Sequence, residues 1–77
     1  MSFTQETKYW QGTRRLSPRQ LQILREASLG LSNPEIADRL GIGTHTVKRH
    51  MQWVTHKLNA RNRAHAVAIA FEKGLLR

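Results

Sequence analysis

Residues 31–50, LSNPEIADRLGIGTHTVKRH, carry the pattern that decides the fold. Ser32 followed three residues later by Glu35 is the signature of a capping box at a helix N-terminus. Gly41 is suited to end that helix, so the pattern predicts a short helix over about 33–40. The letters GIG that follow predict a tight turn into another helix, which is the spacing of a helix-turn-helix unit. The residues expected on the inward side of the short helix are Ile36, Ala37 and Leu40.

The segment after the turn predicts a longer helix over about 44–58, capped by Gly43 or Thr44. Its apolar residues recur at positions i, i+4, i+7 and i+11, which share one face. These inward residues are Val47, Met51, Val54 and Leu58. Stepping around the helix by about 100° per residue from Val47 places a set of polar side chains on the opposite face. That outward set is His45, Lys48, Arg49, Gln52 and His56.

The outward face of this helix contains donors and cations but no carboxylate anywhere from 44 to 58. A helix face that is merely soluble usually mixes charges of both signs, because i,i+4 ion pairs stabilise it. The major groove of DNA instead favours Lys and Arg opposite guanine and Gln opposite adenine. The pattern therefore favours a DNA-reading helix over a simple solvated face.

Two further helices are expected. Ser17 as a cap, Pro18 at the first helical position and Gln20 closing a box predict a helix over about 18–29. Its inward residues are expected to be Leu21, Leu24 and Ala27 or Ser28, and its outward residues Gln22, Arg25 and Glu26.

Asn62 is placed to cap a last helix over about 63–73. No segment alternates as a strand would, so the chain reads as all-α with four helices. Residues 1–15 read as an N-terminal arm or linker before a domain at 16–77.

Composition narrows the function classes. The chain has 77 residues, no cysteine and a formal charge of +8, from 13 Lys+Arg against 5 Asp+Glu. That charge favours a polyanionic partner, most simply nucleic acid. The histidines lack metal-ligand spacing, and no nucleophile elbow or phosphate loop occurs, so we expect no metal, no cofactor and no enzyme activity. No apolar run approaches the length of a membrane span, and no secretory signal is evident at the N-terminus.

Residues 16–76 resemble the LuxR/GerE-type helix-turn-helix domain of bacterial transcription regulators. The strongest pieces of the resemblance are GLSNPEIADRLGI, TVKRH, KLNARNRAHAV and the closing GLL. The resemblance implies a four-helix domain whose third helix enters the major groove and whose fourth helix commonly forms a homodimer. A sigma-factor region-4-like module shares part of this pattern, but the stretch after the third helix favours the LuxR type.

Carried over by position, the resemblance implies which residues touch DNA. Base contacts are expected from Lys48, Arg49 and Gln52, with His45 added from the same outward face. Backbone contacts are expected at the matching positions Asn33, Thr46 and Lys57, and at Arg63, whose role is structural as much as phosphate-binding. Thr44, next to the Gly43 cap, is added to these expected backbone contacts.

The sequence departs from the family at two positions. Gly43 stands where Ser or Thr often caps the third helix. Trp53 stands on the flank of that helix where a small polar residue is common. We expect Trp53 to pack against Tyr9 and Trp10 of the arm, with stacking on DNA sugars or a protein contact as the alternatives.

The last helix is apolar on more sides than one core contact requires. Ala66, Val67 and Ala70 can face the domain, whereas Ala68, Ile69 and Phe71 lack obvious cover in a monomer. Small residues would also allow close approach of a second helix. The dimer interface expected from this reasoning comprises Ala66, Ile69, Ala70 and Lys73. The alternative is that Ile69 and Phe71 fold back onto the first helix or the arm.

The sequence therefore predicts a sequence-specific regulator that binds double-stranded DNA, in the cytoplasm at the nucleoid. Its expected partners are DNA and a second copy, with RNA polymerase or a larger regulator as further candidates. The alternative is a protein-binding co-regulator or antagonist that pairs with a larger LuxR-type regulator. The sequence names neither the operator nor the input signal. It leaves open activation or repression, and whether the chain is a complete regulator or an excised output domain.

Overall fold

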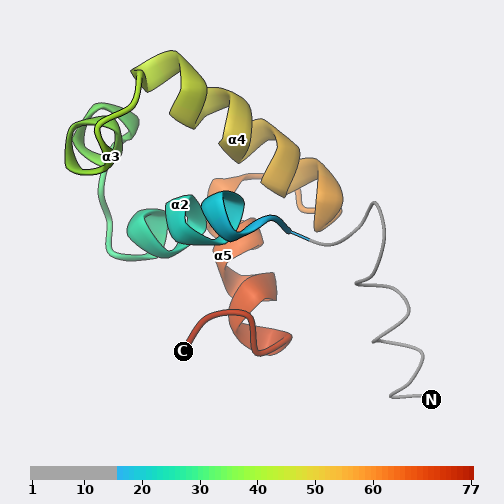
Figure 1. Ribbon diagram of the computed structural model, residues 1–77. Helices are drawn as coiled ribbons and strands as arrows, with labels where there is room; N and C mark the ends of the chain where they lie inside the picture. Colours follow the sequence, from blue (N-terminus) through green and yellow to red (C-terminus); the bar gives the residue numbers. More distant parts are fainter. Residues whose placement is uncertain (1–15) are drawn as a thin grey trace.

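The computed structural model describes residues 16–77, which form helices and no strand (Figure 1). The helices are α2 (Pro18–Ser28), α3 (Asn33–Leu40), α4 (Thr44–Lys57) and α5 (Arg63–Glu72). The expected all-α helix-turn-helix architecture is thus confirmed, with each predicted boundary within one residue. Expectations about the arm, including Tyr9 and Trp10, lie outside the described residues.

Local capping explains where α2 and α3 begin. The Ser17 hydroxyl accepts from the Gln20 amide at 3.1 Å, and the Gln20 side chain accepts from the Ser17 amide at 3.0 Å. Ser32 and Glu35 form the same reciprocal pair at 3.3 and 2.8 Å. Each box satisfies backbone donors that the first helical turn leaves without an intrahelical partner.

One hydrophobic core holds the helices together. α4 packs against α2, α3 and α5. In Figure 1, α4 spans the top of the domain, and α5 leads away from it toward the C-terminus. Val47 and Val54 are both 0% exposed, which fixes one face of α4 in this core. Burying such a side chain contributes about 1.5–3 kcal/mol to the stability of the fold. Because Val47 and Val54 hold their face of α4 in the core, the opposite face of the helix points to solvent. The remaining fully buried hydrophobic side chains are Ile23, Leu24, Ile36, Ala66 and Ala70.

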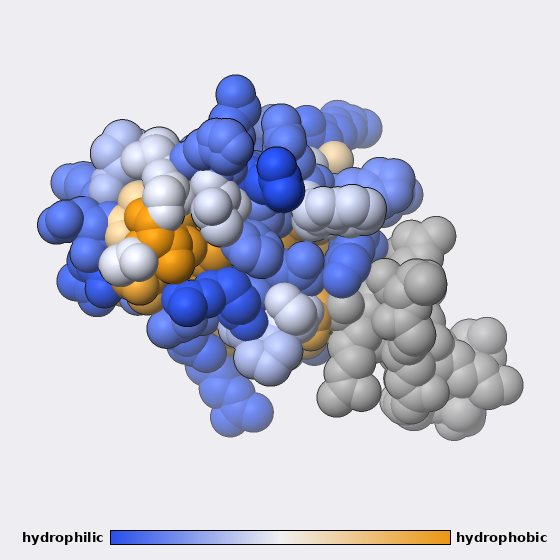
Figure 2. All heavy atoms as spheres, turned by 45° about the horizontal axis from the view of Figure 1, so that its top comes forward, coloured by the Kyte–Doolittle hydropathy of each residue, from blue (hydrophilic) through white to orange (hydrophobic). Residues whose placement is uncertain are grey.

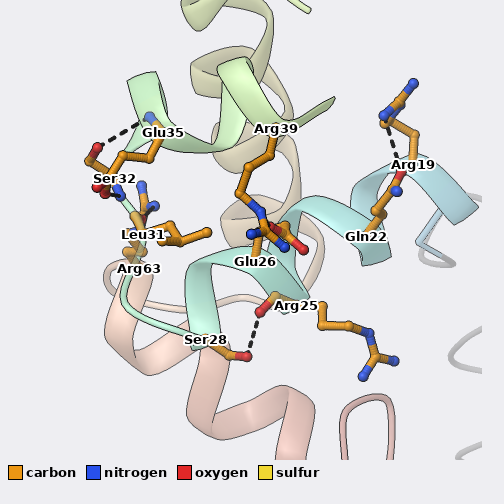
Figure 3. Close-up of polar contacts among 10 residues, drawn as sticks. All are labelled: Arg19, Gln22, Arg25, Glu26, Ser28, Leu31, Ser32, Glu35, Arg39 and Arg63. Atoms are coloured by element: carbon orange, nitrogen blue, oxygen red, sulfur yellow. Dashed lines mark hydrogen bonds and ion pairs between the residues drawn. The ribbon is translucent and has the colours of Figure 1, made fainter. Parts of the chain in front are cut away.

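The expected inward face of α2 was wrong in two places. Ile23 is fully buried, whereas Leu21 is only half-buried. Glu26, which we expected to face outward, is buried and pairs with Arg39 of α3 at 2.5 Å (Figure 3). The buried face of α2 is centred on Ile23 and Leu24, and Arg39 of α3 pairs with the Glu26 carboxylate that this orientation buries. Helical periodicity alone does not reveal a partner on another helix.

The link from α4 to α5 is short and well defined. Leu58 caps the C-terminus of α4, and Asn59 then adopts a left-handed backbone with φ of 56°. Asn62 accepts from the His65 amide at 2.9 Å, which confirms Asn62 as the N-cap of α5. This turn directs Arg63 back toward the start of α3.

Candidate nucleic-acid interface

The outward face of α4 is exposed and free of acidic side chains. Because Val47 and Val54 are buried, the residues opposite them face solvent. The exposed set is His45, Lys48, Arg49, Gln52 and His56, as the helical spacing predicted. Figure 2 shows that hydrophilic residues cover most of this side of the domain. The face can donate hydrogen bonds and attract anions, which is the chemistry that DNA base edges and phosphates require.

The N-terminus of α4 is capped by backbone alone. Gly43 occupies the cap with φ of −75° and ψ of 147°, and it makes no side-chain cap. Its carbonyl accepts from the amides of Thr46 and Val47, both at 3.1 Å. Of the two expected caps the structure has Gly43, and Thr44 is the first helical residue. Thr44 and Thr46 are both exposed beside the N-terminal end of the outward face.

A hollow of about 390 Å³ lies where α4 meets the first residues of α3 and α5. Lys48, Gln52 and His56 reach it from α4, and Asn33 and Arg63 reach it from the two helix N-termini. Helix N-termini carry partial positive charge, which adds to that of the side chains. The hollow therefore joins two expected base-contact residues to two expected backbone-contact residues.

Arg63 is held by hydrogen bonds inside the protein. Its Nη1 donates to Asn33 Oδ1 at 2.6 Å, and its Nη2 donates to the Leu31 carbonyl at 2.8 Å. Figure 3 shows the Arg63 side chain beside Leu31 and Ser32, at the entrance to α3. The guanidinium thus ties the start of α5 to the start of α3, a contact between residues 30 positions apart. Sequence reasoning did not foresee this pair, because no local pattern encodes it.

Lys57 also has a partner within the domain. It is half-buried, and its Nζ donates to Gln20 Oε1 at 3.0 Å. Gln20 Oε1 also accepts from the Ser17 amide, so Lys57 supports the capping box of α2. Lys57 therefore stabilises the fold as well as standing near the end of the outward face.

Trp53 lies on the flank of α4 and is 52% exposed. Its ring meets the His56 ring edge-on, with centroids 6.2 Å apart and planes at 82°. The contact with Tyr9 and Trp10 that we expected falls on residues outside the described part of the chain. His50, on the core side of the same flank, has a buried Nδ1 with no hydrogen-bond partner in the described structure.

The residues expected at a dimer interface are placed unequally. Ala66 and Ala70 are both 0% exposed because they pack against the domain's own core, so neither has surface left for a second copy. Ile69 is half-buried and packs against the same core, and Lys73 caps the C-terminus of α5. The two alanines thus belong to the domain's own core, and the dimer interface stays a prediction. The exposed side of α5 instead presents Ala64, Ala68 and Phe71, at i, i+4 and i+7.

Glu35 lies in the first turn of α3, within the described residues 16–77. The pKa of Glu35 is lowered, first by the hydrogen bond from the Ser32 backbone amide and then by that from the Ser32 hydroxyl. Within the same residues, no three His, Cys, Asp or Glu side chains are grouped to hold a metal ion. No helix in this part of the chain is long and apolar enough to cross a bilayer.

Comparison with known proteins gives a consistent result. Residues 14–70 match the family model of bacterial regulatory proteins of the luxR family. The transcriptional activator protein YukR of Yersinia ruckeri is 44% identical over 62 residues, which cover 80% of this chain and 27% of YukR. The nitrate/nitrite response regulator protein NarP of Escherichia coli is 40% identical over 58 residues, covering 75% of this chain and 27% of NarP.

The HTH-type transcriptional activator RamA of Corynebacterium glutamicum is 42% identical over 64 residues, covering 83% of this chain and 23% of RamA. The chain thus spans about a quarter of the length of the curated relatives it matches. The similarity concerns the helix-turn-helix part of these relatives.

Proposed function

Because the chain belongs to the luxR family of bacterial regulatory proteins, we propose that it binds double-stranded DNA sequence-specifically and regulates transcription. The observation that carries the proposal is the exposed, acid-free face of α4, with the cationic hollow beside it. In this proposal α4 lies in the major groove. Lys48, Arg49, Gln52 and His45 contact base edges there.

Affinity and specificity come from different residues in this proposal. Cations release counterions from the phosphate backbone and supply affinity for any sequence. Asn33, Thr44, Thr46 and Lys57 are proposed to contact the backbone and fix the register of α4. Bidentate contacts from the α4 face discriminate between bases.

A homodimer would place two α4 helices about 34 Å apart, one turn of DNA. We base this part of the proposal on the exposed Ala64, Ala68 and Phe71 of α5, of which Phe71 is 47% exposed. A cytoplasmic location at the nucleoid follows from DNA binding. RNA polymerase or a larger regulator remain candidate partners.

Selection of bound duplexes from a random pool at physiological salt tests the proposed function. We expect enrichment of a near-palindromic motif with half-sites one helical turn apart. Enrichment of a single half-site would support DNA binding without dimerisation. No enrichment would contradict the proposal and favour the second candidate.

The second candidate is a co-regulator that binds a larger LuxR-type regulator. Two large apolar residues favour it, since Trp53 is 52% and Phe71 is 47% exposed. A module that acts only through protein contacts has no need of an acid-free α4 face, so we rank it second.

Direct readout predicts different results at two positions of α4. Gln52→Ala should relax base preference at one position by about 1–3 kcal/mol, because a bidentate contact to adenine is lost. Lys57→Ala should weaken binding to all DNA sequences alike. It should also reduce by about 0.9 the salt slope, which is the slope of the logarithm of the binding constant against the logarithm of the salt concentration. Binding titrations at several salt concentrations, on the selected duplex and its single-base variants, measure both effects.

The Lys57 variant needs a folding control, because Lys57 also donates to Gln20. Unfolding curves should therefore accompany the titrations. If both variants lost affinity uniformly across sequences, direct readout by the α4 face would be wrong.

A further inference from the structure

We infer that Arg63 is a positioning residue for DNA binding, which acts by orienting the side-chain amide of Asn33. This inference rests on the proposed function and refines the role of one expected backbone contact. Both residues line the hollow beside α4, together with Lys48 and Gln52.

The chemistry of the pair fixes the orientation of the Asn33 amide. A guanidinium has donors only, so the atom that meets Arg63 Nη1 at 2.6 Å must be the carbonyl oxygen of Asn33. The amide nitrogen of Asn33 is then the group left to donate. Amide N–H groups are suitable donors to phosphate oxygens, whereas an amide turned the other way would present an oxygen that repels them.

The geometry of the guanidinium fork makes the orientation rigid. Nη2 of the same group donates to the Leu31 carbonyl at 2.8 Å, so the fork has two fixed acceptors on the segment that leads into α3. Arg63 is half-buried, and a planar fork with two acceptors loses little further freedom on binding. A lysine could reach one of these acceptors as a point charge but could not reproduce both contacts.

The arrangement also couples two helices. Arg63 is the first residue of α5, and Asn33 is the first residue of α3. Their hydrogen bond links the N-terminus of α3 to that of α5, and both residues line the hollow beside the α4 face. Loss of the fork should therefore disturb DNA binding through Asn33 without removing a phosphate contact of its own.

The binding experiment uses the duplex selected by the wild-type chain and the variants Asn33→Ala, Arg63→Gln, Arg63→Lys and Asn33→Ala/Arg63→Gln. Each single variant should lose affinity by about tenfold, the size of one charge-assisted hydrogen bond. The double variant should lose no more than either single variant, since the two residues act as one unit. The salt slope should not change in Arg63→Gln, and Arg63→Lys should fail to restore affinity.

Two controls separate this role from charge and from folding. Arg61→Gln removes the same charge two residues earlier without touching Asn33, and it should leave affinity nearly unchanged. In the free protein, the Asn33 side-chain amide resonances should shift in Arg63→Lys and stay in place in Arg61→Gln. Melting curves of all variants report the fold.

The outcomes distinguish the inference from the function on which it rests. Additive losses, a salt slope reduced by about 0.9 and rescue by lysine would overturn the inference and make Arg63 a direct phosphate ligand. Unmoved Asn33 amide resonances in Arg63→Lys would overturn it as well. A wild-type chain that enriches no duplex would overturn the proposed function itself, and the DNA role of Arg63 with it.

Discussion

Gly41 and Gly43 bracket the turn before α4, and their backbones differ. Gly41 is left-handed, with φ of 69°, and caps the C-terminus of α3. Gly43 has φ of −75° and ψ of 147°, an extended backbone that any residue adopts. Glycine is therefore needed for conformation at Gly41 only. At Gly43 its effect is to leave α4 without a side-chain cap.

Gly43→Ser should raise the free energy of unfolding by roughly 0.5–1 kcal/mol, since a hydroxyl would cap α4 and the unfolded chain would lose freedom. A Cβ at this position meets only Thr46 Oγ1, at an ordinary 3.7 Å. Gly41→Ser is the matched control, and it should destabilise by about 1 kcal/mol because its backbone is left-handed. Urea unfolding measures both, and equal changes in the two variants would contradict this account.

At the scale of elements, α2 and α3 begin with the same capping box but differ in the residue at the third helical position. α2 uses neutral Gln20, whereas α3 uses Glu35. The pKa of Glu35 is lowered by its hydrogen bonds to Ser32. A carboxyl group whose pKa is lower folded than unfolded stabilises the fold when ionised. This contribution of Glu35 to the free energy of unfolding is present at neutral pH. It is lost as the pH falls from about 4.3, the ordinary glutamate value, through the lower pKa of the folded state.

Glu35→Gln tests this linkage, because glutamine can form the same box without titrating. The variant should be less stable than the wild type at pH 7, and the difference should shrink as the pH falls toward 3. Every other carboxyl group is present in both the wild type and the variant, so its contribution to the pH dependence cancels in the difference. Unfolding free energies measured across this range give the result, and a difference independent of pH would rule out Glu35 as its source.

Local patterns predicted the helices, but they did not predict the contacts between them. Ser17, Ser32 and Asn62 act on amides three residues away, so their roles are legible in the sequence. The outward face of α4 was likewise predictable, because one apolar stripe determines its opposite. Contacts between elements depend on how helices pack, and they were missed. These are the pairing of Glu26 with Arg39, of Arg63 with Asn33 and of Lys57 with Gln20.

At the scale of the whole molecule, the N-terminus of α5 reaches the hollow beside the α4 face through Arg63, whereas the rest of α5 leads away from α4 (Figure 1). A second copy bound at Ala68 and Phe71 would therefore leave the α4 face open to DNA. Ala66 and Ala70 could not be assigned from sequence, since a small residue on an apolar helix suits both a core and a dimer contact. The structure places them in the core, whereas Ala64, Ala68 and Phe71 are exposed.

Ala68→Glu is the sharpest test of a dimer formed through α5. Ala68 is exposed, so the substitution should preserve the fold and place a charge where the partner helix would lie. Ile69→Glu is less informative, because Ile69 packs against the core. Ala68→Glu should abolish cooperative binding to a two-half-site duplex while leaving affinity for a single half-site within about threefold, as expected of a substitution away from the DNA-binding face. The control Gln22→Glu adds the same charge on exposed α2 and should bind cooperatively. Sedimentation with both duplexes reads out the stoichiometry, and cooperative binding that survives in Ala68→Glu would place the dimer contact outside this face of α5.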